Sequence, residues 1–344
     1  MGFPQFYFGF SKNLLPLVLV LEAMASRGAE EGGHAATSDE AAGGSTEANM
    51  QRLEHRLLEL RNLHQGNHPD IATTLHSLGE LSQQTGDLTE GIKFLQESLK
   101  MQRSLHGDCD HPGIAATLHK LGDLTAQSGD LKQGMQFFQE SLRMQRSLHG
   151  DSDHLGIAIT LHKLGDVAIL RGDSKQGIKF LQESLKMQRS LHGDRNHAGV
   201  AITLRKLGDV MAQTGDVAQA LKNLQESADV NDSLYGKKDH PNVADVLHSL
   251  GKANQRAGDL EQAEQFLERS LQMKESLFAD KKHPSLRLTA NLLDQVRTLA
   301  QKGFNDTGKD IFDNMDAKMP ASRSISGIKV ANEIGGTHES SRKA

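Results

Sequence analysis

A short stretch of the sequence, LHGDCDHPG at residues 105–113, concentrates side chains that can bind metals or act as nucleophiles. It holds His106, His111, two aspartates and Cys109, the only cysteine of the chain. His, Cys and Asp are common ligands of transition metals, and a cysteine near a histidine can become a nucleophilic thiolate. Taken alone, the stretch is a candidate metal or catalytic site.

The composition of the chain points to an all-helical protein. Its 344 residues include no tryptophan and only 4% aromatic residues, while aliphatic residues, Gln, Lys and Glu are abundant. The net charge of −5 is mild and gives no electrostatic indication of nucleic-acid binding, which would require a clustered basic surface. A single cysteine cannot form an internal disulfide, so nothing marks the fold as built for an oxidising compartment.

A repeat of 43 residues fills the middle of the chain, and it gives five units over residues 68–282 without insertion or deletion. One histidine column consists of His68, His111, His154, His197, His240 and His283. One glycine column consists of Gly79, Gly122, Gly165, Gly208 and Gly251. Gly-Asp pairs recur at 86–87, 129–130, 172–173, 215–216 and 258–259. Self-similarity at such a period is typical of stacked repeat proteins.

Each unit predicts two helices. In the first unit, Ile71, Leu75 and Leu78 fall at helical spacing, and the Gly-Asp pair then predicts a turn. A second helix follows, with a broad apolar stripe that indicates contact on two sides. Glycine inside a helix costs roughly 1 kcal/mol relative to alanine, so the recurrence of Gly79 and Gly91 predicts a close approach of the two helices.

The sequence Leu78-Gly79, with Gly91, Leu95 and Ser98 in the second helix, resembles the tetratricopeptide repeat (TPR). The long unit is most similar to repeats of kinesin light chains and nephrocystin-3-like proteins. The closing proline of the family is replaced by arginine, as at Arg103, so the second helix is expected to reach about residue 106. The resemblance covers residues 68 to about 300. It implies an all-α, right-handed superhelical TPR solenoid of antiparallel helix pairs.

The flanking segments receive separate expectations. Residues 47–66 contain about two heptads of leucines, which favours an N-terminal capping helix over a coiled coil. Residues 283–302 predict a C-terminal capping helix, with Asp294 at the glycine position. The polar residues 303–344 are expected to be largely disordered, and residues 26–46 to form a flexible linker.

Residues 1–25 contain an apolar run, Leu14 to Leu21, that is too short to span a membrane. The run is compatible with the core of a signal or targeting segment. A second possibility is that translation starts at Met24 and the preceding residues are a gene-model artefact.

The resemblance also implies a peptide-binding groove formed mainly by the first helices of the repeats. Its first column holds His76, His119, His162, Arg205 and His248. Its second holds Ser77, Lys120, Lys163, Lys206 and Ser249, and its third holds Glu80, Asp123, Asp166, Asp209 and Lys252. Kinesin light chains tend to have Asn in the first two columns, so their cargo motif does not simply carry over.

A basic column beside an acidic one favours a ligand with carboxylates, because lysine donates charge-assisted hydrogen bonds to them. The alternative is that Lys and Asp three residues apart on one helix only pair with each other in solvent. If His119 and His162 face a ligand, its binding should strengthen as they protonate below about pH 6.5. Neighbouring repeats lie on the order of 10 Å apart, which is too far for these histidines to share a metal ion.

The sequence therefore predicts a non-enzymatic scaffold that binds a protein or peptide, and a cargo adaptor like a kinesin light chain is its most specific form. The short leucine segment puts binding to a kinesin heavy chain in doubt. No cofactor, nucleic acid or stable membrane span is expected, and the expected location is cytoplasmic, with cytoskeletal association or targeting by residues 1–25 left open. The alternative is a metal-dependent or catalytic protein that uses the His/Asp/Cys-rich loops, although no catalytic motif is present.

Comparison with the other repeat units changes the interpretation of residues 105–113. Cys109 is replaced in other units by Ser, Arg or Lys, and His106 by Tyr235 and Phe278, so neither a thiol nor a metal ligand is required there. Asp110 is expected to cap the next helix. His111 recurs in every unit, and we expect it to form a hydrogen bond across the joint between repeats.

Overall fold

The computed structural model describes residues 46–107, 109–150, 152–193, 196–236 and 238–316, with side chains as far as residue 302. The regular structure in these ranges consists of twelve α-helices and no strands, which confirms the predicted all-α class. None of the described helices combines the length and the apolar character needed to cross a membrane. The apolar segment 1–25, the linker up to residue 45 and the tail from residue 317 lie outside the described residues.

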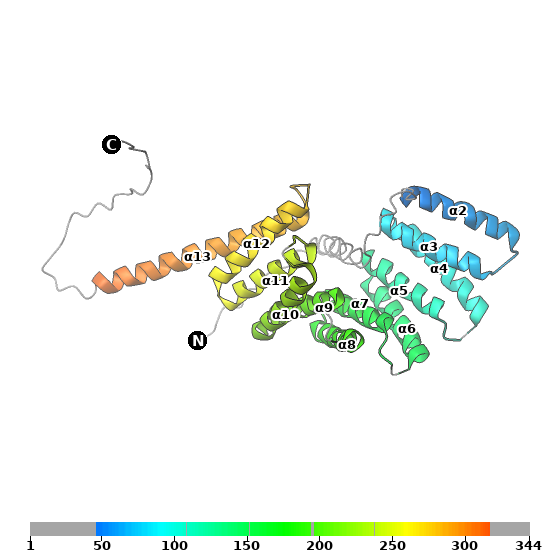
Figure 1. The fold of residues 1–344 in the computed structure, drawn as a ribbon, viewed down its shortest axis with the longest axis horizontal. Helices are drawn as coiled ribbons and strands as arrows, with labels where there is room; N and C mark the ends of the chain where they lie inside the picture. The colour runs from blue at the N-terminus through cyan, green and yellow to red at the C-terminus, as the bar shows by residue number, and fades with distance from the viewer. Residues whose placement is uncertain (1–45, 108, 151, 194–195, 237, 317–344) are drawn as a thin grey trace, which may run out of the picture. The chain divides into compact units, whose positions relative to one another are not determined.

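The helices pack in chain order as antiparallel pairs, and Figure 1 shows consecutive pairs lying side by side. The first helix is α2 (Thr46–Leu63). The first helix of each pair, here the A helix, is α3 (Pro69–Thr85), α5 (Pro112–Gln127), α7 (Leu155–Leu170), α9 (Ala198–Thr214) or α11 (Pro241–Ala257). The second, the B helix, is α4 (Leu88–His106), α6 (Leu131–His149), α8 (Ser174–His192), α10 (Val217–Tyr235) or α12 (Leu260–Leu277).

The helix ends agree with the sequence in the repeats and differ at the C-terminal end. The B helix α4 ends at His106, as the missing proline predicts. The last helix, α13 (Pro284–Asp316), continues beyond residue 302 into a segment that we expected to be disordered. It crosses from a compact unit that ends at Arg297 into a second unit that begins at Thr298.

The Gly-Asp pair ends one helix and begins the next. Gly86 has φ +86°, a left-handed conformation that glycine adopts without a steric penalty. The Asp87 carboxylate then accepts a hydrogen bond of 3.0 Å from the backbone N–H of Glu90, which caps α4. The same aspartate cap recurs at the start of each B helix, at Asp130, Asp173, Asp216 and Asp259.

The two helices of a repeat approach closely, as the recurring glycines predict. A Cβ atom at Gly79 would lie only 2.5 Å from Leu95 Cγ, so no side chain fits there. Ser98, which is fully buried in α4, donates a hydrogen bond of 2.6 Å to the carbonyl oxygen of Ala72 in α3. Both contacts recur in all five pairs, so the same geometry joins helices A and B throughout the array.

The joint between repeats is built from stacked rings. The rings of His106 and His111 stack at 3.7 Å, and Tyr235 with His240 and Phe278 with His283 form the same stack. The predicted cap by Asp110 is wrong, because His111 is the N-cap: its Nδ1 accepts a 3.1 Å bond from the N–H of Gly113. The expected hydrogen bond across the joint is also wrong, since this bond is local and stacking makes the contact across the joint. Asp110 instead lies 3.6 Å from Arg143.

The close approach predicts that Gly208→Ala destabilises the array. An alanine Cβ would lie 2.5 Å from Leu224 Cγ and 3.1 Å from the Ala220 carbonyl oxygen. We expect the free energy of unfolding in urea to fall by about 2 kcal/mol, because overpacking outweighs the helix propensity of alanine. Gly199→Asn, which copies Asn242 of the next repeat, is the control and should cost much less, because its Cβ would meet only the side chains of His197, at 3.1 Å, and Gln188. Equal stability of Gly208→Ala and the parent would contradict the close approach.

Substitutions of the two stacked rings, His106 and His111, should affect stability differently. His111→Phe keeps a stacking ring but removes the acceptor that caps α5, so it should cost about 1 kcal/mol and lower the melting temperature. His106→Phe copies the natural pair of Phe278 and His283 and should change the melting temperature little. Thermal unfolding followed by circular dichroism measures both. Equal losses in the two variants would show that ring identity matters and the cap does not.

Candidate functional site

The histidines predicted to line the groove lie between consecutive A helices. Nδ1 of His76, His119, His162 and His248 each lies 3.0 Å from a threonine hydroxyl on the next A helix along the chain. The threonines are Thr117, Thr160, Thr203 and Thr289, which are all buried. The histidine column therefore joins repeats to each other, and its rings are only partly exposed.

Burial keeps part of this column neutral. It lowers the pKa of His119 to about 4, and the nearby charges of Lys163 and Lys120 act in the same direction, against Asp123. Burial likewise lowers the pKa of His248 to about 3. Since His119 stays neutral near pH 6.5, the predicted strengthening of ligand binding through its protonation is not expected.

The predicted basic and acidic columns form a ladder of ion pairs between repeats. Lys120 Nζ lies 3.3 Å from Glu80, Lys163 lies 3.1 Å from Asp123, and Lys206 lies 3.5 Å from Asp166. Each lysine thus reaches back to the preceding A helix, whereas the sequence suggested pairing along a single helix. The carboxylates of this ladder are held by two neighbouring helices at once.

The ladder shifts the titration of its carboxylates. Burial alone would raise the pKa of Asp166, but the charges of Lys206 and His162 hold it well below its usual range. Burial opposes ionisation of Asp123 as well, and Lys163 and His119 together lower its pKa. Both carboxylates are therefore ionised at neutral pH and already have cationic partners.

The ladder is interrupted between α9 and α11. Arg205 replaces the histidine and contacts Asp209 on its own helix at 3.5 Å, while Ser249 and Lys252 replace the lysine and the acid. Around this interruption lies a hollow of about 100 Å³, and its polar lining is formed by Asp166, Lys206, Asp209, Gln213 and Lys252. No ion pair to Lys252 is found among the described residues, so it is a candidate cation for a bound ligand.

A buried ion pair beside this interruption was missed by sequence reasoning. Lys274 of α12, with a side chain only 5% exposed, lies 3.1 Å from Asp245 of α11 and 3.3 Å from the hydroxyl of Thr289. Lys274 occupies the position of Gln102 in the first repeat, and Asp245 that of Ile202. This double departure from the repeat pattern was the signal that could have revealed the pair.

Exposed apolar side chains on α7 were also missed. Leu155 is 44% exposed and Ile159 is 39% exposed, one helical turn apart and preceding His162 and Lys163 on the same helix. The position of Ile159 is held by Thr73 in α3 and Ala116 in α5, and that of Leu155 by Pro69 and Pro112. The middle of the predicted groove thus presents aliphatic surface beside the ladder.

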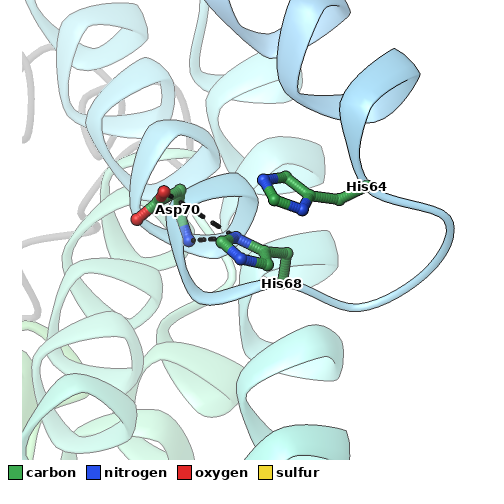
Figure 2. A group of neighbouring side chains, drawn as sticks. All are labelled: His64, His68 and Asp70. Carbon is green, nitrogen blue, oxygen red and sulfur yellow. Dashed lines mark hydrogen bonds and ion pairs between the residues drawn. The ribbon is translucent and has the colours of Figure 1, made fainter.

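One group of three potential metal ligands occurs in the described part of the chain. His64, His68 and Asp70 bring one ligand atom each to within 4.8 Å of one another (Figure 2). The two imidazole rings stack at 3.5 Å, and Nδ1 of His68 already accepts a hydrogen bond from the N–H of Asp70. Phe278 and His283 form an equivalent stack without a second imidazole, so we interpret the group as a joint between helices.

We also interpret residues 105–113, the candidate metal or catalytic site of the sequence, as a joint between helices. Cys109 is exposed, and His106 and His111 are engaged in the ring stack and the helix cap. Both histidines of this stretch thus already take part in contacts that join the two helices.

The sequence model of the tetratricopeptide repeat matches residues 70–147, 156–233 and 199–276 of the chain. The chain matches no curated protein at the sequence level. Among solved structures it is similar to BtubC (BKLC) from P. vanneervenii, with a TM-score of 0.58 and 18% identity over 70% of this chain and 96% of that chain.

Two further structures share the arrangement of helices. A Podosopora anserina protein with nearly identical TPR-like repeats, described as a kinesin light chain, gives a TM-score of 0.53 and 17% identity over 62% of this chain and 99% of that chain. The apo quorum sensor NprR from B. thuringiensis gives 0.55 and 14% identity over 82% of this chain and 71% of that chain. At these identities the likeness concerns the fold alone.

The buried histidines predict that stability falls with acidification. An unfolded histidine takes up a proton near pH 6.5, whereas His119 resists it until about pH 4, so its stabilisation is present above pH 6.5 and is lost as the pH falls through this window. The loss should be of the order of 2 kcal/mol per such histidine at pH 4.5. Urea unfolding of the parent and of His119→Gln between pH 7 and 4.5 measures it. Identical slopes in the two proteins would contradict the assignment.

Proposed function

The chain belongs to the tetratricopeptide repeat family, and on that premise we propose that it is a non-enzymatic scaffold that binds an extended peptide or partner helix along its A helices. The family match supports the general role of a protein-interaction scaffold. The proposed contact surface runs over α5, α7, α9 and α11. It includes the predicted columns His119–His162–Arg205–His248, Lys120–Lys163–Lys206 and Asp123–Asp166–Asp209.

The observation that carries this proposal is the exposed pair Leu155 and Ile159 in the middle of that surface. Exposed aliphatic side chains flanked by polar groups are typical of protein-binding sites. Covering each of them would contribute of the order of 2 kcal/mol. A peptide with aliphatic residues next to charged ones matches such a surface.

The structure limits which lysine can contact an acidic ligand. Lys120, Lys163 and Lys206 are neutralised by the preceding repeat, so a ligand carboxylate would have to compete with Glu80, Asp123 or Asp166. Lys252, at the interruption of the ladder, shares the hollow with Asp166 and Asp209 but forms no ion pair with a carboxylate of the described residues. We therefore assign the contact with a ligand carboxylate to Lys252 and the hollow beside it.

The more specific form of the proposal is a cargo adaptor like a kinesin light chain, located in the cytoplasm or on the cytoskeleton. Its support is the type of repeat and the shared fold. Binding to a kinesin heavy chain is not included, because α2 is a single helix that packs against α3.

A displayed peptide library tests the scaffold function directly. We expect the parent to select peptides with shared aliphatic residues, and Leu155→Ser/Ile159→Ser to weaken their binding at least tenfold through lost apolar contact. Leu288→Ser is the matched control, because Leu288 is 49% exposed at the same repeat position on α13 and lies outside the proposed contact. Calorimetric titration of a selected peptide gives the affinities. Failure to select any peptide, or equal affinity of the double variant, would overturn the proposal.

A further inference from the structure

The outer side of the B helices carries two exposed columns whose charge reverses along the array. We call them the B stripe. It consists of Lys100 and Arg103 on α4, Arg143 and Arg146 on α6, Lys186 and Arg189 on α8, Asp229 and Asp232 on α10, and Gln272 and Glu275 on α12. Two positions three residues apart share one face of a helix, and the 43-residue period brings them into line from one B helix to the next.

The reversal falls between α8 and α10. All six stripe residues of α4, α6 and α8 are basic, both residues of α10 are acidic, and α12 adds Glu275. The modest net charge of the whole chain conceals this separation. The B stripe is therefore a dipolar surface that has its boundary within one face.

Part of this charge is neutralised within the chain, and part is not. Arg103, Arg146 and Arg189 form ion pairs with glutamates of the following B helix. Among the described residues no ion pair is found for Lys186 on α8 or for Asp229 on α10. An unneutralised cation and an unneutralised anion thus flank the boundary.

The acidic side of the boundary also has an apolar hollow. Ala228 stands where α4, α6, α8 and α12 have leucine, as in Leu185 of α8. A hollow of about 80 Å³ lies here, with Val246 and Phe266 in its apolar lining and Gln225, Asp232 and Arg269 as its polar residues. Because Arg269 and Asp232 share this lining, the hollow adds apolar contact area at the boundary, and the charges of the B stripe decide the partner.

From these features we propose that two copies of this chain associate through the B stripe, antiparallel, with a two-fold axis at the boundary between α8 and α10. In this arrangement the basic α8 of each copy faces the acidic α10 of the other, so one contact is made twice and the dimer is closed. A polyanionic partner would be repelled by α10, and a parallel pairing would bring like charges together. Because the basic and acidic parts of the B stripe are complementary to each other, the binding partner that fits this surface is a second copy of the chain.

The proposed interface is small and electrostatic. Two helices from each copy bury less area than a standard interface, and exposed ion pairs contribute little individually. Salt at about 0.5 M shortens the Debye length to less than half its value at about 50 mM. Dimerisation is therefore weak, and it depends on salt.

Sedimentation velocity of the full chain at about 100 µM tests the proposal. We expect a dimer at about 50 mM salt and a monomer at about 0.5 M. Asp229→Lys/Asp232→Lys makes the stripe basic on both sides of the boundary, and Lys179→Glu/Lys186→Glu makes α8 acidic; Lys179 is also exposed on α8. Each variant alone should show at least a tenfold weaker self-association, and an equimolar mixture of the two should restore a dimer.

The control is Glu54→Lys/Glu59→Lys, which changes the net charge as much as the basic variant but on exposed positions of α2. It should dimerise like the parent, and circular dichroism checks that all variants fold. A monomeric parent at low salt, or a mixture that stays monomeric, would overturn the proposal. Masses that grow beyond a dimer would contradict the two-fold arrangement.

Discussion

The close approach of helices A and B within a repeat is the contact on which the other features depend. It requires a position without a side chain in the A helix, because a Cβ at Gly165 would lie 2.7 Å from Leu181 Cγ. It also requires a small hydroxyl in the B helix, because Ser184 donates to the Ala158 carbonyl while fully buried. Each pair is thereby fixed at one spacing, and every neighbouring repeat meets the same surface.

Because the same pair of helices recurs every 43 residues, each contact between repeats recurs along the array and its residues form a column. The histidine-threonine bond, the ring stack and the ladder of ion pairs each occur between one repeat and the next, as nearest-neighbour coupling in a solenoid requires. Departures from a column are then local and informative. Arg205 and Lys274 change the charges at one interface, while Asp229 changes the sign of the outer face without disturbing the pairs beneath it.

Residue periodicity was sufficient to predict the fold, because helix spacing and small residues are encoded locally. The site was less predictable. Asp110 was the expected cap since carboxylates are favoured at helix N-termini, but the geometry of the joint gave that position to the ring nitrogen of His111. The ladder was missed for a related reason: Lys163 is near Asp166 in sequence, and only the tilt of neighbouring helices brings it to Asp123. Such contacts depend on three-dimensional packing between repeats.

The same constraint explains how the described array ends. Arg61 of α2 pairs with Glu97 as Arg103 of α4 pairs with Glu140, so the two arginines correspond. Five residues before them, α2 has Arg56 where α4 has Ser98. A buried hydroxyl that joins two helices in the repeats is thus replaced by an exposed arginine in α2. At the other end, Asp294 of α13 occupies the glycine position, where a B-helix leucine would otherwise pack. On each terminal helix of the described array, a charged residue thus replaces a small one at a close contact of the repeat, while the apolar face toward the array remains intact.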